Sequence, residues 1–251
     1  MMDGASSESR KPTLREREVH VWRVALDSVS PSGERLDSCL SPDERIRAAQ
    51  FIAPLEQRRY VASRIVLRHV LASYHDMDAA AVPLVREVGG RPFVQGADRV
   101  FFSLSHTADI GLIAVARAVV GVDVERHRSV ARAANIARRI LHAETVAMLE
   151  ALPPPEFDIA FIDAWTQREA HVKAVGGGLF RTPDVLPFDP SQPHDASVRS
   201  VTSRADGGRW SVARFLPYEA ARAAVAVPGP LDSIRFMDWQ DVMHDLRRGR
   251  R

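Results

Sequence analysis

The sequence predicts an α+β protein made of two lobes with similar plans. A strand, then helices, then several short strands follow one another, and the same order recurs after about residue 120. The chain has 251 residues, which is enough for two lobes of roughly 120 residues that each bury a core. The inferred duplication depends on this order of elements, because no identity between the halves is visible.

The first half starts with a polar segment and then alternates between strand and helix patterns. Residues 1–13 lack apolar periodicity and are expected to be disordered. Alternation predicts a strand at 19–24, and the segment 41–44 (SPDE) has the N-cap, proline and early acids of a helix start. Helical patterning continues to about Tyr74 with a break at Pro54. Short strands are expected at 82–88, 93–94, 100–104 and 110–116.

The second half repeats this order. A strand is expected at 119–125 and helical structure at 130–150, followed by a break at the three prolines 153–155. A strong helix at 157–175 ends at three glycines. Further strands are expected at 197–203, 209–216 and 222–227, and a short amphipathic helix at 236–246. We therefore expect lobes at 14–119 and 120–246, and a basic tail at 247–251.

Composition excludes several classes of protein. The 34 basic and 32 acidic residues give a net charge of only +2, which does not support a nucleic-acid partner. The single Cys39 excludes an intrachain disulfide and a cysteine zinc cluster. The start of the chain has no apolar signal region, and the longest apolar stretch contains Arg117 and is too short to span a bilayer. A cytoplasmic protein without a membrane partner is expected.

The segment 121–125 (GVDVE) places two acids on one face of a strand, with valines on the other face. Adjacent carboxylates raise each other's pKa unless a cation lies between them. Oxygen ligands of this kind suit Mg²⁺. Taken alone, the Asp123-x-Glu125 pattern is more typical of a strand end that enters solvent.

Glu169 and Lys173 are four residues apart on the predicted helix, so both lie on one face, above Trp165. A surface ion pair would explain this spacing. Lysine is rare in the chain, however, since Lys11 and Lys173 are its only two. An ammonium group is a compact point charge that a guanidinium does not replace, which favours a specific role for Lys173.

Two further segments could contact an anion. The strand at 100–107 ends in Ser105, His106 and Thr107, where the histidine could donate to an anionic oxygen or simply to a carbonyl. Gly90-Arg91-Pro92 forms a tight turn that presents an arginine, and arginine suits phosphate by its fork geometry. A plain hairpin turn is the alternative.

The order of these segments resembles the Sfp-type 4′-phosphopantetheinyl transferases. The resemblance covers about residues 41–180, and the separation of 44 positions from Glu125 to Glu169 also matches the family. Its motifs are GRP at 90–92, FSLSHT at 102–107, GVDVE at 121–125 and WTQREAHVKAVGGGL at 165–179.

The resemblance implies two pseudo-twofold-related α+β lobes with the active site in the cleft between them. The implied reaction moves the 4′-phosphopantetheine of coenzyme A onto a serine of a carrier protein and releases adenosine 3′,5′-bisphosphate. Asp123, Glu125 and Glu169 match the Mg²⁺ ligands, and Glu169 is also a candidate for orienting or deprotonating the serine. Lys173 matches the lysine beside the diphosphate. The matches to coenzyme A contacts are Arg47, Gly90, Arg91, Ser105, His106 and Thr107.

The expected partner is an acyl or peptidyl carrier protein of fatty-acid, polyketide or nonribosomal-peptide synthesis, and the enzyme is expected to be a monomer. An acidic carrier would be steered by a basic rim. The candidates for this rim are Arg126, Arg128, Arg132, Arg138 and Arg139. Two alternatives stay open: a Mg²⁺-dependent nucleotide-sugar glycosyltransferase, and a non-catalytic module that binds coenzyme A or a carrier protein.

Overall fold

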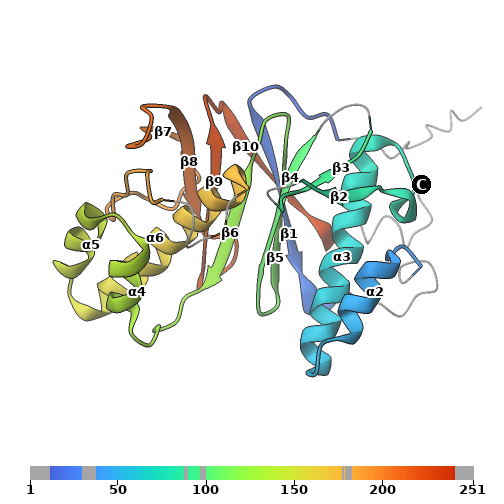
Figure 1. Ribbon diagram of the computed structural model, residues 1–251, viewed down its shortest axis with the longest axis horizontal. Coiled ribbons are helices and arrows are strands. Elements are labelled where there is room, and N and C mark those ends of the chain that lie inside the picture. The colour runs from blue at the N-terminus through green and yellow to red at the C-terminus, as the bar shows by residue number, and fades with distance from the viewer. Residues whose placement is uncertain are drawn as a thin grey trace, which may run out of the picture.

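The computed structural model describes residues 12–29, 38–87, 90–96, 100–176, 178 and 183–240. Within these ranges it contains two four-stranded sheets, one small two-stranded sheet and several helices, which confirms the predicted α+β class (Figure 1). No helix in these ranges is long and apolar enough to cross a membrane. Most of the segment predicted to be disordered and the whole basic tail lie outside the described residues.

The first sheet has the strand order β10-β1-β5-β4. β1 pairs antiparallel with β5 and parallel with β10, so a strand from the end of the chain lies beside one from its beginning. β5 (IGLIAVA) is buried along its whole length because both faces of the sheet are covered. The strands are β1 Glu18–Ala25, β4 Phe101–Thr107, β5 Ile110–Ala116 and β10 Ser233–Asp238.

Helices α2 and α3 begin where the sequence predicts. Ser41 caps α2 in a capping box, in which its side chain accepts from the Glu44 N–H and the Glu44 side chain accepts from the Ser41 N–H. Proline stands at the start of both helices, which confirms the predicted break near Pro54. The helices are α2 Pro42–Ala49 and α3 Pro54–His75, with 3-10 turns η1 Leu26–Ser28 and η2 Ala79–Ala81.

The second sheet has the order β6-β9-β8-β7 and is antiparallel throughout. The small sheet pairs β2 with β3 across the turn that contains Gly90. The remaining strands are β2 Leu84–Arg86, β3 Pro92–Val94, β6 Gly121–Arg126, β7 Arg199–Thr202, β8 Arg209–Phe215 and β9 Ala221–Pro228.

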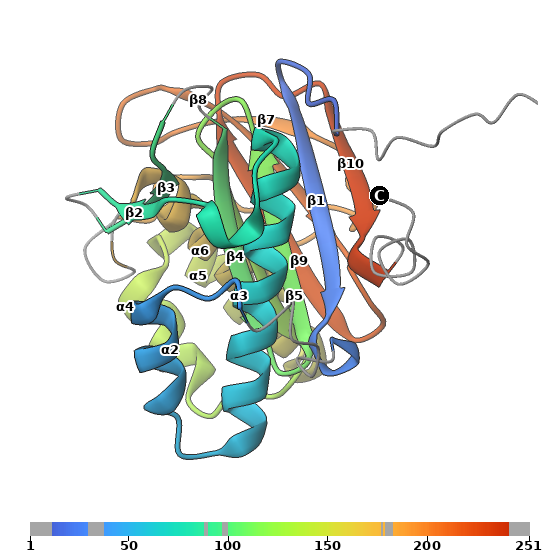
Figure 2. The same cartoon turned by 90° about the vertical axis from the view of Figure 1, so that its right-hand side faces the viewer.

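The two large sheets face each other, and a helix covers the outer face of each (Figures 1 and 2). Apolar side chains of β1 and β5 pack between the sheets against Val122 and Val124 of β6 and against β9. A second core lies between α3 and the first sheet, and a third lies between α6 and the second sheet. β6 therefore has one face in the core between the sheets and the other face toward α6.

The helices of the second half differ from the prediction in two places. The helical segment predicted at 130–150 is divided, because the chain is extended at Leu141 and His142 caps the next helix. The helix predicted from 157 begins earlier, at Pro154, because proline is compatible with the first helical turn. The prolines do mark the predicted break, since the preceding helix ends at Glu150. The helices are α4 Ala133–Ile140, α5 Ala143–Glu150 and α6 Pro154–Val175.

The helix predicted at 236–246 is wrong at its start. Residues up to Asp238 belong to β10, where pairing with β1 and an ion pair between Arg23 and Asp238 favour the extended chain. Trp239 follows and is buried in the core beside α3. Residues 241–246 lie outside the described residues.

α6 approaches β6 unusually closely at Gly121. A Cβ atom on Gly121 would lie 1.8 Å from the carbonyl oxygen of Ala170 and 2.8 Å from the backbone nitrogen of Ala174. Ala170 and Ala174 are completely buried. Only glycine allows this contact, so Gly121 sets how near the residues of α6 come to those of β6.

We expect Gly121→Ala to lower the free energy of unfolding by about 1–3 kcal/mol, because the added methyl group must displace the backbone of α6. Urea denaturation followed by circular dichroism measures this change. Gly208→Ala is the control, since its Cβ would meet only the side chain of Asp206, at 3.1 Å. Equal losses in the two variants would contradict the close-contact argument.

Candidate active site

The two acids of β6 lie on the strand face that points away from the core between the sheets. Asp123 is 4% exposed and Glu125 is half-buried, while Val122 and Val124 pack in that core. This is the alternation that the sequence predicts. It places both carboxyl groups on the side of β6 that α6 covers.

α6 brings Lys173 and Glu169 to the same place. The Lys173 Nζ donates to Asp123 Oδ1 over 2.7 Å. The charge of Glu169 interacts with those of Asp123, Lys173 and, more weakly, Glu125. The structure thus brings these four residues together, although 44 residues separate Glu125 from Glu169.

β4 supplies hydroxyl groups from the other sheet. The Ser105 Oγ donates to Asp123 Oδ1 over 2.7 Å and accepts from the Val124 N–H over 3.3 Å. The Thr107 Oγ1 donates to Glu125 Oε2 over 3.1 Å. Two of the residues expected to contact coenzyme A therefore also hold the acids of β6.

Burial and mutual repulsion act on the glutamates. Burial raises the pKa of Glu169, and the charge of Asp123 raises it further, with Lys173 acting in the opposite direction. Burial likewise raises the pKa of Glu125, again with Asp123 as the second cause. The charges of Lys173, Arg168 and Arg128 act in the opposite direction but leave both pKa values raised, so the cluster favours an additional cation.

The donor set fits a hard divalent cation such as Mg²⁺. Asp123 Oδ2 is buried and has no hydrogen-bond partner in the structure, so it offers a lone pair for which the described residues provide no donor. All three groups are carboxylates, the ligands that Mg²⁺ prefers. Among the described residues, however, no three acidic, histidine or cysteine side chains already converge as a metal site. Asp123 instead accepts a hydrogen bond from the Lys173 ammonium group.

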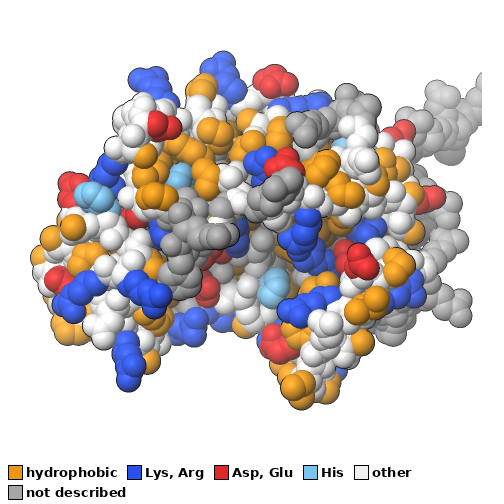
Figure 3. Space-filling view, in the orientation of Figure 1, with side chains coloured by type: hydrophobic (Ala, Val, Ile, Leu, Met, Phe, Trp, Pro, Cys, Tyr) orange, Lys and Arg blue, Asp and Glu red, His pale blue; other side chains and the backbone are white. Residues whose placement is uncertain are grey.

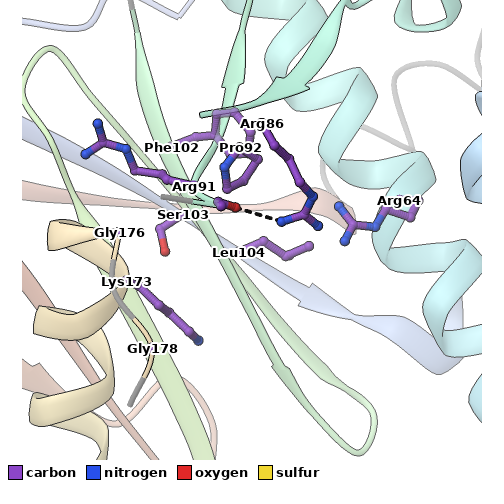
Figure 4. A pocket seen from close by; sticks show the side chains of 11 residues that line it. Arg64, Arg86, Arg91, Pro92, Phe102, Ser103, Leu104, Lys173, Gly176 and Gly178 are labelled. Carbon is purple, nitrogen blue, oxygen red and sulfur yellow. Dashed lines mark hydrogen bonds between the residues drawn. The ribbon is translucent and has the colours of Figure 1, made fainter. Parts of the chain in front are cut away.

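A cavity of about 380 Å³ lies next to this cluster, and Lys173 lines it together with three arginines (Figure 4). Arg64 comes from α3 and Arg86 from β2, and their guanidinium groups lie near one another. Like charges held together in this way favour a bound anion. The other lining residues are Gly90, Arg91, Pro92, Phe102, Ser103, Leu104, Gly176 and Gly178.

The turn at residues 90–92 is held against both neighbouring elements. Gly90 has a φ of 84°, a conformation suited to glycine, and its carbonyl accepts from Arg86. Arg91 donates to the carbonyl of Ala174 at the end of α6 and to the Glu87 carboxylate. Arg91 thus lines the cavity as expected, but these contacts also give it a structural role.

Arg47 lies at a second cavity of about 540 Å³, which shares Arg64, Arg86 and Pro92 with the first. Its guanidinium donates to Gln50 and lies over the ring of Phe51. The two cavities are therefore neighbours that have a pair of arginines in common.

His106 is exposed at the end of β4. Partial burial of its ring, followed by the charges of Arg64 and Lys173, lowers its pKa. The charges of Arg64 and Lys173 therefore reach the His106 ring. This supports its grouping with the basic residues of the cavity.

Sequence reasoning missed Arg64, Arg86 and Ser103. Arg64 lies in the middle of a long helix, and nothing in the surrounding sequence distinguishes it from an ordinary helical arginine. Arg86 stands opposite Pro92 in the hairpin, so recognition of the β2–β3 pairing would have indicated it. Ser103 could have been found from the alternation Ser-x-Ser-x-Thr along β4.

Comparison with known proteins agrees with this geometry. The profile of the 4′-phosphopantetheinyl transferase superfamily matches residues 119–227, and that of the 4′-phosphopantetheinyl transferase N-terminal region matches residues 28–118. The 4′-phosphopantetheinyl transferase HetI of Nostoc sp. is 31% identical over 224 residues, which are 86% of this chain and 90% of HetI.

Two Bacillus relatives are more distant. The 4′-phosphopantetheinyl transferase psf-1 of Bacillus pumilus is 27% identical over 58% of this chain and 62% of its own length. The 4′-phosphopantetheinyl transferase Sfp of Bacillus subtilis is 23% identical over 58% of this chain and 64% of its own length. The chain belongs to the 4′-phosphopantetheinyl transferase family. The resemblance inferred from the motifs is confirmed, and the glycosyltransferase alternative is removed.

We expect Glu169→Gln to stabilise the metal-free protein by about 0.5–2 kcal/mol, because it removes one of three crowded negative charges. Thermal and urea unfolding in a chelating buffer measure this. Glu150→Gln is the control, since it breaks the ion pair with Arg138 at the surface and should not stabilise. A loss of stability in Glu169→Gln would show that the acids do not repel one another as described.

Proposed function

We propose that this protein transfers the 4′-phosphopantetheine of coenzyme A to a serine hydroxyl of an acyl or peptidyl carrier protein, releasing adenosine 3′,5′-bisphosphate. The observation that carries the proposal is a cluster of three acids beside a cavity lined by Lys173 and arginines, in a chain of this family. A diphosphate substrate with a divalent cation would satisfy both sets of charges.

Coenzyme A would occupy the two neighbouring cavities. Its diphosphate would lie near Lys173, and the phosphate on its ribose near Arg64, Arg86 and His106. Arg47 and the turn at 90–92 would border the nucleotide. The site would then lie in a cleft between two lobes, one on each large sheet.

Asp123, Glu125 and Glu169 would hold Mg²⁺, which supplies positive charge that neutralises the diphosphate and polarises the attacked phosphorus. Lys173 would add a fixed positive charge at the same diphosphate. Because Lys173 already donates to Asp123, its ammonium is positioned before substrate arrives.

In the reaction, the serine oxygen forms a bond to the phosphorus that carries pantetheine. The bond between this phosphorus and the bridging oxygen breaks, and the oxygen leaves with adenosine 3′,5′-bisphosphate. The serine proton passes to Glu169 or to water. Alignment of the two substrates can itself remove about 7–11 kcal/mol of the barrier, so positioning is the main task of the residues named here.

The carrier would approach along a basic rim, with the enzyme acting as a monomer in the cytoplasm. Arg126 is paired with Asp109, and Arg138 with Glu150, so part of the expected rim is already neutralised. Arg128 and Arg132 are exposed and are the better candidates for steering an acidic carrier.

Mass spectrometry of apo carrier proteins incubated with enzyme, coenzyme A and Mg²⁺ tests the proposal. We expect the phosphopantetheine mass increment with the wild-type protein and almost none with Glu169→Gln, whose fold should remain intact. Glu150→Gln should transfer normally. Transfer by Glu169→Gln at the wild-type rate would refute the role of Glu169, and no transfer to any carrier class would favour the binding-module alternative.

We further expect His106→Ala and Arg64→Ala to lose about 10-fold more activity with coenzyme A than with dephospho-coenzyme A, since a hydrogen bond to a charged group contributes about 1.5–3 kcal/mol. The ratio of kcat/KM values for the two substrates measures this selectivity. Equal losses with both substrates would place these residues away from the ribose phosphate.

A further inference from the structure

β4 and β6 are edge strands of different sheets, yet they lie against each other. The contacts that join them are made by side-chain hydroxyls of β4. The Ser103 Oγ accepts from the Val122 N–H over 3.1 Å, and the Ser105 Oγ accepts from the Val124 N–H over 3.3 Å. The two N–H groups on this edge of β6 are therefore satisfied by serine rather than by a backbone carbonyl.

The hydroxyls occur at every second position of β4, so they share one face of the strand. Each hydroxyl forms a hydrogen bond with a residue of β6 that lies 18 or 19 positions later in the sequence; the three are Ser103, Ser105 and Thr107. Together these three hydroxyls form what we call the hydroxyl ladder. Its spacing matches the alternation of β6, so the strands stay in phase over three contacts.

Two hydroxyls of the ladder also donate hydrogen bonds to the two acids of β6. A hydroxyl can accept one hydrogen bond and donate another. Ser105 uses both capacities: it accepts from the backbone of β6 and donates to Asp123 Oδ1. Thr107 donates to Glu125 Oε2. The same contacts that join the sheets therefore fix the direction in which each carboxylate points.

Ser103 differs from the other two because, within the described residues, no hydrogen bond joins it to either acid. It is 6% exposed and lines the first cavity, and its Oγ accepts from the N–H of Val122, the residue before Asp123. This contact gives Ser103 a route to the acids through the backbone of β6. Because Ser103 also lines the cavity, its effect on metal binding has to be measured with the metal alone.

We propose that the hydroxyl ladder positions Asp123 and Glu125 for a divalent cation, and that Ser103 is a positioning residue of this site. The proposal rests on the metal role in the proposed function and adds to it the residues that orient the acids. Groups that orient metal ligands commonly change metal affinity by about 10–100-fold when removed. Ser105 and Thr107 would then serve the acids as well as coenzyme A.

Binding of Mn²⁺ alone, followed by electron paramagnetic resonance without coenzyme A, tests the ladder. We expect Ser103→Ala and Thr107→Val each to weaken Mn²⁺ binding by about 10-fold. Ser103→Thr should restore it, because threonine keeps the hydroxyl and already forms one contact of the ladder. Thr107→Val changes almost no volume, which keeps the test valid if Ser103→Ala folds poorly.

Ser211→Ala is the matched control. Ser211 is a buried serine on β8, which β9 separates from the acid-bearing β6, and its Oγ donates to the carbonyl of Gly229. It should lower the melting temperature about as much as Ser103→Ala and leave Mn²⁺ binding unchanged. Wild-type affinity in both ladder variants would overturn the ladder alone, whereas absence of Mn²⁺ binding by the wild-type protein would overturn the metal role and the ladder together.

Discussion

The site depends on one carboxylate oxygen, Asp123 Oδ1, at which three elements of the fold meet. β6 carries the aspartate, α6 provides Lys173, and β4 provides Ser105, with both hydrogen bonds 2.7 Å long. A lysine and a serine reach the same oxygen only if α6 lies directly on β6 and β4 lies against its edge. Gly121 permits the first of these contacts, and the serine side chains make the second.

The arrangement leaves unbalanced charge within a partly buried site. Asp123 Oδ2 is unpartnered, and burial and repulsion act on Glu125 and Glu169 together. A protein selected for stability alone would not keep three acids so close together at such a position. The imbalance is understandable if a cation and an anionic substrate complete the site, because each then supplies the charge that the other lacks.

Much of this could be predicted from the sequence, because it depends on local patterns. The alternation of GVDVE fixes which face the acids share, and the spacing of Glu169 and Lys173 places both on one helical face. The capping box at Ser41 likewise marks the start of α2. Family resemblance joined these separate signals into one site, which no single pattern could do.

The parts that could not be predicted depend on how distant segments meet. β10 pairs with β1, which lies more than 200 residues earlier in the sequence. The local pattern at 236–238 does not show this pairing and instead predicts the start of a helix. The alternation Ser-x-Ser-x-Thr marks one polar face of β4, but it does not show what Ser103 contacts, because its partner belongs to another sheet. Arg64 and Arg86 become a pair only after α3 and β2 have packed around a common cavity.

Cations and acids are separated across this site in a way that suits a substrate with a diphosphate. Arg64 and Arg86 lie on α3 and β2 and the acids on β6 and α6, while Lys173 donates to Asp123 and also lines the cavity. An anion in the cavity would therefore be adjacent to Lys173 on one side and to the arginines on the other. Since residues of β4 line the cavity and its hydroxyl ladder bonds to the acids, a single strand contributes to both the acid cluster and the cationic cavity.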